Sequence, residues 1–349
     1  MSNVRPLASP IMRLACLLLL LTASLLLPMQ SWATTEMEER AAIRSATRNA
    51  FLKEDFSQLE EVSLNYRLTK SRTPSGIWKL TVFHAGISEA IKERARAQER
   101  EAAFRELEGM TARWAKRHPN SPSARIAHSS VLISHAWAFR GDGYASTVKP
   151  EAWKPFRKYI AMARAYLEKH KAIAAVDPRW YEEMLTVAKA EGWKRDEVDR
   201  LLDEALDREP LFYQTYFEAL SYLLPKWHGG TREIDDFARK AVQRTSKQEG
   251  QGMYARIYWY ASQAEFRNQL FSDSMVVWPL MKSGFEDVIA RYPDAWNLNN
   301  YAKFACLAGD KLKARELLER TKVSIMSEAW QSREAPEMRE RCASWASKP

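Results

Sequence analysis

The sequence is poor in residues that break helices and form tight turns. It contains 12 glycines and 15 prolines among 349 residues. This low content disfavours an architecture of many short strands joined by tight turns. No segment of strand length alternates convincingly between apolar and polar residues, so the sequence predicts an all-α protein.

The sequence also lacks the short motifs of common catalytic and cofactor-binding sites. It has no GxSxG, no HExxH and no glycine-rich phosphate-binding loop. Its six histidines are scattered rather than spaced three or four apart, so no metal is predicted. Adjacent acids such as Glu182 and Glu183 point apart on a helix and do not form a general acid–base pair. We expect no cofactor, and nothing here indicates an enzyme.

Charge of one sign is not concentrated anywhere in the chain. The 53 basic and 44 acidic residues give a net charge of +9 and are interspersed, as in residues 92–106. Pairs such as Glu101 and Arg105, four residues apart, are typical of solvated helix faces. A nucleic-acid surface would instead need a basic stripe with stacking rings, so no nucleic-acid partner is predicted.

One long apolar run occurs, near the beginning of the sequence. Arg5 and Arg13 precede an apolar stretch over 14–27, and the small residues Ser31 and Ala33 follow it. This order is typical of a secretory signal peptide cleaved between Ala33 and Thr34. The run is shorter than the roughly 20 residues that span a bilayer, which favours cleavage over a retained anchor. The sequence therefore predicts a periplasmic or secreted protein without a transmembrane span after cleavage.

Only three cysteines are present, and Cys16 lies in the predicted signal peptide. The remaining Cys306 and Cys342 can pair in only one way in an oxidising compartment. Cys306 lies in an apolar helical segment, which disfavours a reactive thiolate. We predict a disulfide between Cys306 and Cys342 that fastens the C-terminal segment to the last helical hairpin.

Helical periodicity covers most of the chain after residue 34. The expected helices are 35–54, 77–118 with an interruption near Gly86, 123–140, 151–176, 178–192, 195–208, 211–224, 231–246, 252–270, 277–291, 295–308 and 311–326. Proline, glycine and aspartate mark the breaks between them. The domain organisation expected is a signal peptide over 1–33, an N-terminal helical region over 34–122 and a helical-repeat domain over 123–349.

Two segments of the predicted repeat domain follow one pattern. Residues 180–210 and 295–322 each contain a helix, a turn with glycine (Gly192 and Gly309), and a helix with a small residue (Ala205 and Ala314). Small residues at these positions let paired helices cross closely, as in tetratricopeptide repeats. We therefore expect a tetratricopeptide-like α-α superhelix, a solenoid of stacked helical hairpins that bury their apolar faces on one another.

Several aromatic-rich stretches support a family resemblance. These stretches are HAWAFRGDGYASTV (135–148), YLLPKWHGG (222–230), YARIYWY (254–260), WNLNNYAKFACLAGD (296–310) and RERCASW (339–345). With them, most of the chain resembles the bacterial family Domain of Unknown Function 4034. The resemblance implies an exported helical-repeat protein and implies no activity.

Two loops carry the first candidate ligand-binding residues. Arg140, Asp142 and Tyr144 lie in a glycine-flanked loop after a helix, where they could present hydrogen-bonding groups. The alternative is an ordinary helix-ending turn. Trp227 and His228 lie in a second loop, where the indole could stack on a ligand and the imidazole could transfer a proton. The alternative for Trp227 is a packing role between hairpins.

Arg256 and Tyr258 are further candidates, on one predicted helix. Arg256 and Tyr260 are four residues apart and share a face suited to carboxylate recognition, whereas Tyr258 points elsewhere. The alternative is an aromatic core with an arginine at its rim.

Together these features favour an envelope protein that binds a peptide or protein partner. The alternative is an envelope hydrolase whose site combines the Arg140–Tyr144 and Trp227–His228 loops.

Overall fold

Helices follow one another along nearly the whole part of the chain that the computed structural model describes, which is residues 35–97, 99–141, 143–331 and 337–348. No strand occurs in these ranges, so the all-α prediction is confirmed. Thr35–Pro349 forms one compact unit. The predicted signal peptide, its cleavage site at Ala33 and Thr34, and Asp142 lie outside the described residues.

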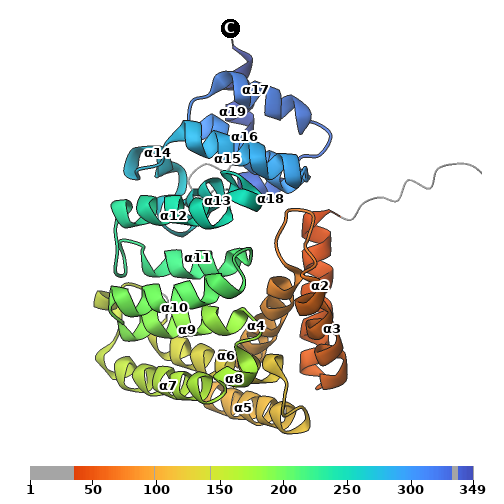
Figure 1. Cartoon of the computed structure of the whole chain (residues 1–349), viewed down its shortest axis with the longest axis vertical. Coiled ribbons are helices and arrows are strands. Elements are labelled where there is room, and N and C mark those ends of the chain that lie inside the picture. The colour runs from red at the N-terminus through yellow and green to blue at the C-terminus, as the bar shows by residue number, and fades with distance from the viewer. Residues whose placement is uncertain (1–34, 98, 142, 332–336, 349) are drawn as a thin grey trace, which may run out of the picture. The chain divides into compact units, whose positions relative to one another are not determined.

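The N-terminal part of this unit consists of five helices (Figure 1). They are α2 (Glu36–Leu52), α3 (Phe56–Thr69), α4 (Lys79–Ala97), α5 (Arg100–Arg117) and α6 (Pro122–Arg140). Thr35 begins α2 through a capping box with Glu38. Helix α3, whose start is capped by Asp55, was not among the helices predicted from the sequence.

The predicted interruption at Gly86 is wrong, because α4 continues through this residue. Gly86 instead lets α4 approach α2 closely. A Cβ atom there would lie 2.7 Å from the carbonyl oxygen of Arg44 and 2.8 Å from Cβ of Thr47. The interruption lies further on, between the end of α4 at Ala97 and the start of α5 at Arg100.

The remaining helices pack in layers that follow the chain. They are α7 (Pro150–Lys169), α8 (Lys171–Ala174), α9 (Arg179–Glu191), α10 (Arg195–Arg208), α11 (Tyr213–Tyr222), α12 (Thr231–Glu249), α13 (Gly252–Ala261), α14 (Leu270–Asp273), α15 (Trp278–Arg291), α16 (Ala295–Leu307), α17 (Lys311–Arg320), α18 (Ser327–Trp330) and α19 (Met338–Ser347). Helix α9 contacts α7, α10 and α11, and α13 contacts α11, α12 and α15. Each of these helices therefore buries side chains against helices both before and after it in the chain.

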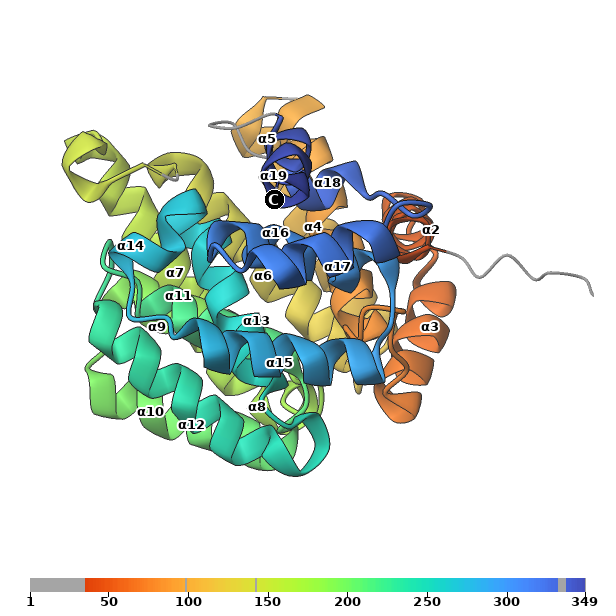
Figure 2. The ribbon, with the colours of Figure 1, turned by 90° about the horizontal axis from the view of Figure 1, so that it is seen from above.

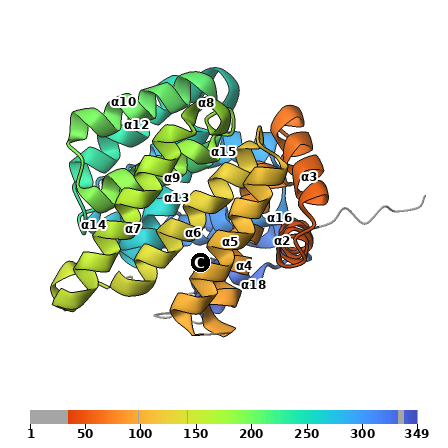
Figure 3. The same cartoon turned by 90° about the horizontal axis from the view of Figure 1, so that it is seen from below.

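Helices α10 and α12 lie side by side on one flank of the layers, with α9 and α13 between them and α6 (Figures 2 and 3). Arg244 of α12 bridges to Asp203 and Asp207 of α10. Both helices bury one apolar face, such as Val198 and Leu201 of α10, and expose the charged one. This amphipathic pattern explains why the sequence predicted α10 with both ends at the correct residues.

The segment 71–78, between α3 and α4, packs against helices much later in the chain. The carbonyl oxygen of Ser75 accepts hydrogen bonds from Arg256 Nη2 of α13 at 2.9 Å and from Asn297 Nδ2 of α16 at 3.3 Å. Arg72 Nη2 donates to the carbonyl oxygen of Leu211 at 3.1 Å. These bonds fasten the N-terminal helices to the α11–α16 layers.

Two apolar clusters make up the core. One is built from α2 to α6 and includes Phe51, Phe83 and Trp114, whereas the other extends from α6 to α19. Helix α6 contributes to both, with Val131 in the first and Ile126 in the second. The predicted regions 34–122 and 123–349 thus meet along α6 within one unit.

The predicted pairing of Cys306 with Cys342 is confirmed at the level of geometry. Cys306 of α16 and Cys342 of α19 are joined as a disulfide, with Cα atoms 5.9 Å apart. Arg315 of α17 also donates to the carbonyl oxygen of Ala346 at 2.9 Å from Nε and 2.7 Å from Nη2. The covalent and hydrogen bonds therefore attach α19 to both helices of the preceding hairpin.

Candidate functional site

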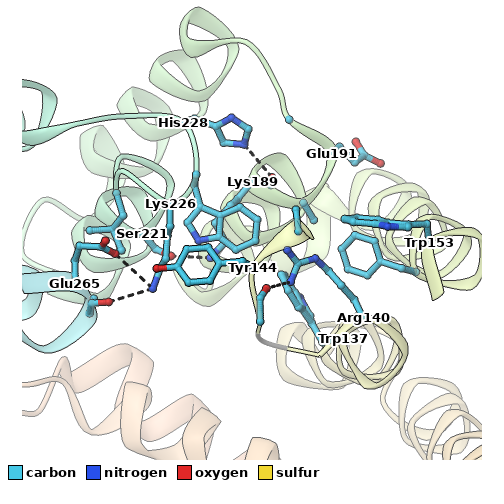
Figure 4. A pocket seen from close by; sticks show the side chains of 18 of the residues that line it. Trp137, Arg140, Tyr144, Trp153, Lys189, Glu191, Ser221, Lys226, His228 and Glu265 are labelled. Carbon is cyan, nitrogen blue, oxygen red and sulfur yellow. Dashed lines mark hydrogen bonds and ion pairs between the residues drawn. The ribbon is translucent and has the colours of Figure 1, made fainter. Parts of the chain in front are cut away.

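A cavity of about 690 Å³ opens where the two loops singled out in the sequence approach each other (Figure 4). Arg140, Tyr144, Trp227 and His228 all line it. Helices α6, α7, α9, α11 and α13 surround these loops and contribute further side chains. The structure thus brings four of the predicted ligand-binding residues to one space, although they lie up to 88 positions apart in the sequence.

Arg140 is held in an unusual environment, with only 7% of its surface exposed. Its guanidinium carbon lies 5.1 Å from the ring centres of Trp137 and Trp227, 5.5 Å from that of Trp153 and 5.9 Å from that of Phe156. We call these four rings the arginine cage. The ring faces attract a cation, and they replace only part of the hydration that the guanidinium loses.

The hydrogen bonds of Arg140 go to neutral backbone carbonyls. Nη1 donates to the carbonyl oxygens of Gly141 and Gly143, both at 3.1 Å. Among the described residues no carboxylate lies within ion-pair distance of Arg140. Burial lowers the pKa of Arg140 from its usual value, and the group stays protonated because that value is so high. The cavity therefore contains a partly desolvated positive charge.

Two lysines add to the positive charge around the cavity (Figure 4). Lys189 of α9 donates to Ser221 Oγ at 2.7 Å and pairs with Glu218 at 2.9 Å. Lys226 donates to the carbonyl oxygen of Ala264 at 3.1 Å and lies 3.8 Å from Glu265 Oε2. Glu218 and Glu265 are thus engaged by lysines, and no carboxylate among the described residues pairs with Arg140.

Trp227 belongs to the wall of the cavity rather than simply filling a gap between hairpins. Its ring packs edge-to-face on Trp137 with centres 6.0 Å apart, and Lys189 Nζ lies 5.7 Å from its centre. The preceding helix holds the loop tightly, since a Cβ atom on Gly229 would lie 2.2 Å from the carbonyl oxygen of Leu223. The loop therefore positions Trp227 rigidly beside Arg140.

His228 makes contacts that do not suit acid–base catalysis. Its Nε2 lies 3.3 Å from the carbonyl oxygen of Lys189, and its ring stacks on Tyr222 with centres 4.7 Å apart. A carbonyl only accepts hydrogen bonds, so Nε2 is the donor. No described carboxylate lies within ion-pair distance of His228.

The wall of the cavity beyond α13 is irregular. Helix α13 ends at Ala261, Ser262–Phe266 forms a π-helical turn, and Arg267 follows with φ of +50°. The continuous helix predicted over 252–270 is therefore wrong. A π-helical turn and a positive φ at a non-glycine residue both cost free energy, and such features often occur at functional sites. Here the turn presents the carbonyl oxygen of Ala264 to Lys226.

Arg256 and Tyr258 do not line this cavity. Tyr258 is fully buried, and its hydroxyl donates to Asp235 Oδ1 at 2.8 Å. Burial raises the pKa of Tyr258 well above its usual value. The assignment of Tyr258 to ligand binding is corrected, because its hydroxyl holds α12 to α13 inside the core. Arg256 instead lines a second, smaller cavity together with Tyr260.

Sequence reasoning missed several residues of the larger cavity. Trp137 lies one helical turn before Arg140, and this spacing could have indicated a shared face. Trp153, Lys189 and Tyr260 belong to other helices, and no local signal connects them with Arg140. Their contribution follows from the packing of α6, α7, α9 and α13.

The polar groups of the described chain show no metal centre. No group of three or more histidine, cysteine or acidic side chains in the described ranges could hold a metal ion. The buried His84 and Asp177 lie 3.1 Å apart and connect α4 with the start of α9. Burial opposes ionisation of Asp177, but His84, the Arg179 amide and Arg67 outweigh it and hold its pKa below the usual range. This pair joins helices and does not border the cavity.

Comparison with known protein families, characterised proteins and solved structures found no match to this chain. In the described part of the chain, no helix is both long and apolar enough to cross a membrane. The geometry of the cavity is therefore the basis for assigning a function.

Proposed function

We propose that this protein is an exported, tetratricopeptide-like helical-repeat protein that binds a peptide or protein partner in the cell envelope. The larger cavity is the binding site, and an acidic group of the partner is the feature that it recognises. One observation carries the proposal: Arg140 is buried in a cage of aromatic rings at a cavity and has no carboxylate partner among the described residues.

A buried charge without a counterion is unfavourable, and proteins normally pair it. A carboxylate entering the cavity would supply the missing counterion of Arg140. Cation–aromatic contacts of the cage keep the guanidinium in place before the ligand arrives, which lowers the entropy that binding must overcome. The volume of about 690 Å³ lies within the usual range of ligand sites.

The cavity also offers apolar contacts. Tyr144 is 67% exposed and lines the same cavity as Trp227, and either ring can stack on an aromatic or proline side chain of a peptide. A tyrosine supplies a large contact area with few rotatable bonds. A peptide with alternating acidic and aromatic residues therefore fits both properties of the cavity.

The repeat architecture in this proposal has support from the order of packing. Helix α9 pairs with α10, and α16 pairs with α17, while α9, α11, α13 and α15 contact one another in turn. Stacked hairpins of this kind form extended surfaces that bind peptides. Export is supported by the N-terminal sequence, and the resemblance to Domain of Unknown Function 4034 remains a prediction.

Binding is tested with a fluorescein-labelled peptide of alternating glutamate and tyrosine and with a peptide of alternating lysine and tyrosine as comparison. Fluorescence anisotropy should show at least tenfold tighter binding of the acidic peptide. Arg140→Met should weaken that binding roughly 10- to 100-fold, because hydrogen bonds to a charged group contribute about 1.5–3 kcal/mol. Arg200→Met removes an exposed arginine from α10 and serves as the control.

Circular dichroism must show that Arg140→Met is folded before its affinity is compared. Equal affinities of the two peptides, or equal affinities of Arg140→Met and Arg200→Met for the acidic one, would refute the proposal. Export is tested separately by N-terminal sequencing of the protein from an envelope fraction. We expect the mature chain to begin at Thr34.

A further inference from the structure

A second cavity, of about 100 Å³, lies between the segment 71–78 and the later helices. Its lining residues come from α2, the segment 71–78, α11, α13 with the following π-helical turn, and α16; the residues used below are Arg40, Ser75, Arg256, Tyr260, Gln263 and Trp296. Tyr260 lines both this cavity and the larger one. The two spaces therefore share a wall.

Arg256 occupies this second cavity in the same unpaired condition as Arg140. Only 4% of its surface is exposed. Its guanidinium carbon lies 4.7 Å from the ring centre of Tyr213 and 5.7 Å from that of Tyr292. Nη2 donates to Ser75, whereas Nε has no acceptor among the described residues. No described carboxylate lies within ion-pair distance of Arg256.

The other arginine of the cavity is already compensated. Arg40 forms an ion pair with the fully buried Glu36 and donates to Ser75 Oγ at 3.2 Å. Glu36 also accepts hydrogen bonds from the Thr73 hydroxyl at 2.9 Å and from the Ser75 amide at 2.8 Å. These bonds hold the Glu36 carboxylate at Arg40 and the segment 71–78, so the uncompensated charge of this cavity is that of Arg256.

The dimensions of the cavity restrict what can enter. A volume of about 100 Å³ corresponds to roughly three water molecules at about 30 Å³ each. A carboxylate with one or two carbons fits this space. Trp296 supplies an apolar wall, and the exposed Gln263 offers an amide at the rim.

We propose that the second cavity is a carboxylate subsite in which Arg256 receives the terminal carboxylate of an extended acidic peptide. Tyr260 borders both this subsite and the larger cavity, and the proposed peptide contacts Arg256 and Arg140 at separate points on either side of it. This inference rests on the proposed function for its peptide ligand. The binding of a small carboxylate at Arg256 can be measured independently of it.

The subsite is tested directly with trifluoroacetate and ¹⁹F NMR. We expect the trifluoroacetate signal to broaden and shift with the wild-type protein. In the Arg140→Met background, where the larger cavity has lost this arginine, Gln263→Trp places a large ring at the exposed rim of the subsite and should abolish most of the remaining effect. Gln243→Trp makes the same change at an exposed position of α12 that lines neither cavity and should leave the effect unchanged in that background.

Arg140→Met distinguishes binding at the second cavity from binding at the larger one. The subsite at Arg256 requires that this variant still broaden the trifluoroacetate signal. If Gln263→Trp leaves the broadening by Arg140→Met unchanged, or if Arg140→Met alone abolishes the effect, the subsite is refuted. An unchanged signal with the wild-type protein refutes it as well.

A second measurement uses the acidic peptide with a free C-terminal carboxylate and the same peptide with a C-terminal amide. The free carboxylate should bind wild type about tenfold more tightly, and Gln263→Trp should remove this difference. Equal binding of both peptides to wild type would overturn the subsite. The proposed function would then be judged separately. Weaker binding of the amidated peptide by Arg140→Met would support it, and unchanged binding would contradict it.

Discussion

Reduction of the Cys306–Cys342 disulfide should destabilise the C-terminal end of the protein selectively. The two cysteines are 36 positions apart. In the chain-entropy model, closing a loop of this length stabilises the folded state by about 4 kcal/mol at 25 °C. Cys306→Ser combined with Cys342→Ser should therefore lower the free energy of unfolding of this region by up to that amount.

The effect should be local because α19 contacts α16 and α17. Without the disulfide, the side-chain bonds from Arg315 and the burial of Cys342 and Ala346 remain to hold α19 in place. End helices of stacked arrays have neighbours on one side only and open most readily. Amide exchange should therefore accelerate in α16, α17 and α19, while α9 and α10 keep their protection.

The assay compares hydrogen exchange by mass spectrometry and urea unfolding for the oxidised protein, the reduced protein and the double serine variant. Reductant should have no effect on the double variant, which serves as the control for other effects of the reagent. Identical unfolding of the oxidised and reduced proteins would refute the stabilisation attributed to the disulfide. A loss of protection spread evenly over all helices would contradict its local character.

Four further substitutions test the packing and electrostatics of the protein. Gly86→Ala should destabilise by about 1–3 kcal/mol in urea unfolding, since the new methyl group would meet the backbone of α2. Gly109→Ala, on α5 with its nearest neighbour atom 3.5 Å away, should instead be neutral or stabilising by up to about 1 kcal/mol. Burial raises the pKa of Glu182 from 4.5 to about 8, so the folded state binds more protons than the unfolded state between these values, and stability should fall as pH rises through this window. Glu182→Gln should remove this pH dependence, which totals roughly 5 kcal/mol of unfolding free energy at most over the window. An unchanged pH profile of unfolding would contradict the raised pKa of Glu182. Tyr258→Phe should lower stability by about 1.5–3 kcal/mol through the lost bond to Asp235 and leave peptide affinity unchanged, whereas weaker binding by the folded variant would return Tyr258 to the ligand site.

Local signals in the sequence were sufficient for most helices. Helix α10 begins and ends where the pattern predicted, because its apolar face, its capping residues and the following proline all lie within one short segment. Where two distant segments meet, local signals gave a wrong prediction. Gly86 was predicted to interrupt a helix, although it allows α2 and α4 to cross closely.

The π-helical turn Ser262–Phe266 shows a second limit of local signals. Its residues continue the helical periodicity of α13, so the sequence predicted a continuous helix there. The turn is instead held by bonds to other parts of the chain, such as that from Lys226 to the carbonyl oxygen of Ala264. A pattern within one segment carries no information on such a partner.

The sequence by itself determined that the protein is helical, where most of its helices lie and which cysteines pair, since periodicity, capping and elimination are local or countable properties. It also indicated Arg140, Tyr144, Trp227 and His228 as candidates. It took the folded structure to show that these four residues share a cavity, that Arg140 is caged by rings with no carboxylate partner among the described residues, and that Tyr258 is buried. The physical reason is that burial and the pairing of a charge depend on side chains from distant helices, such as Trp153 of α7.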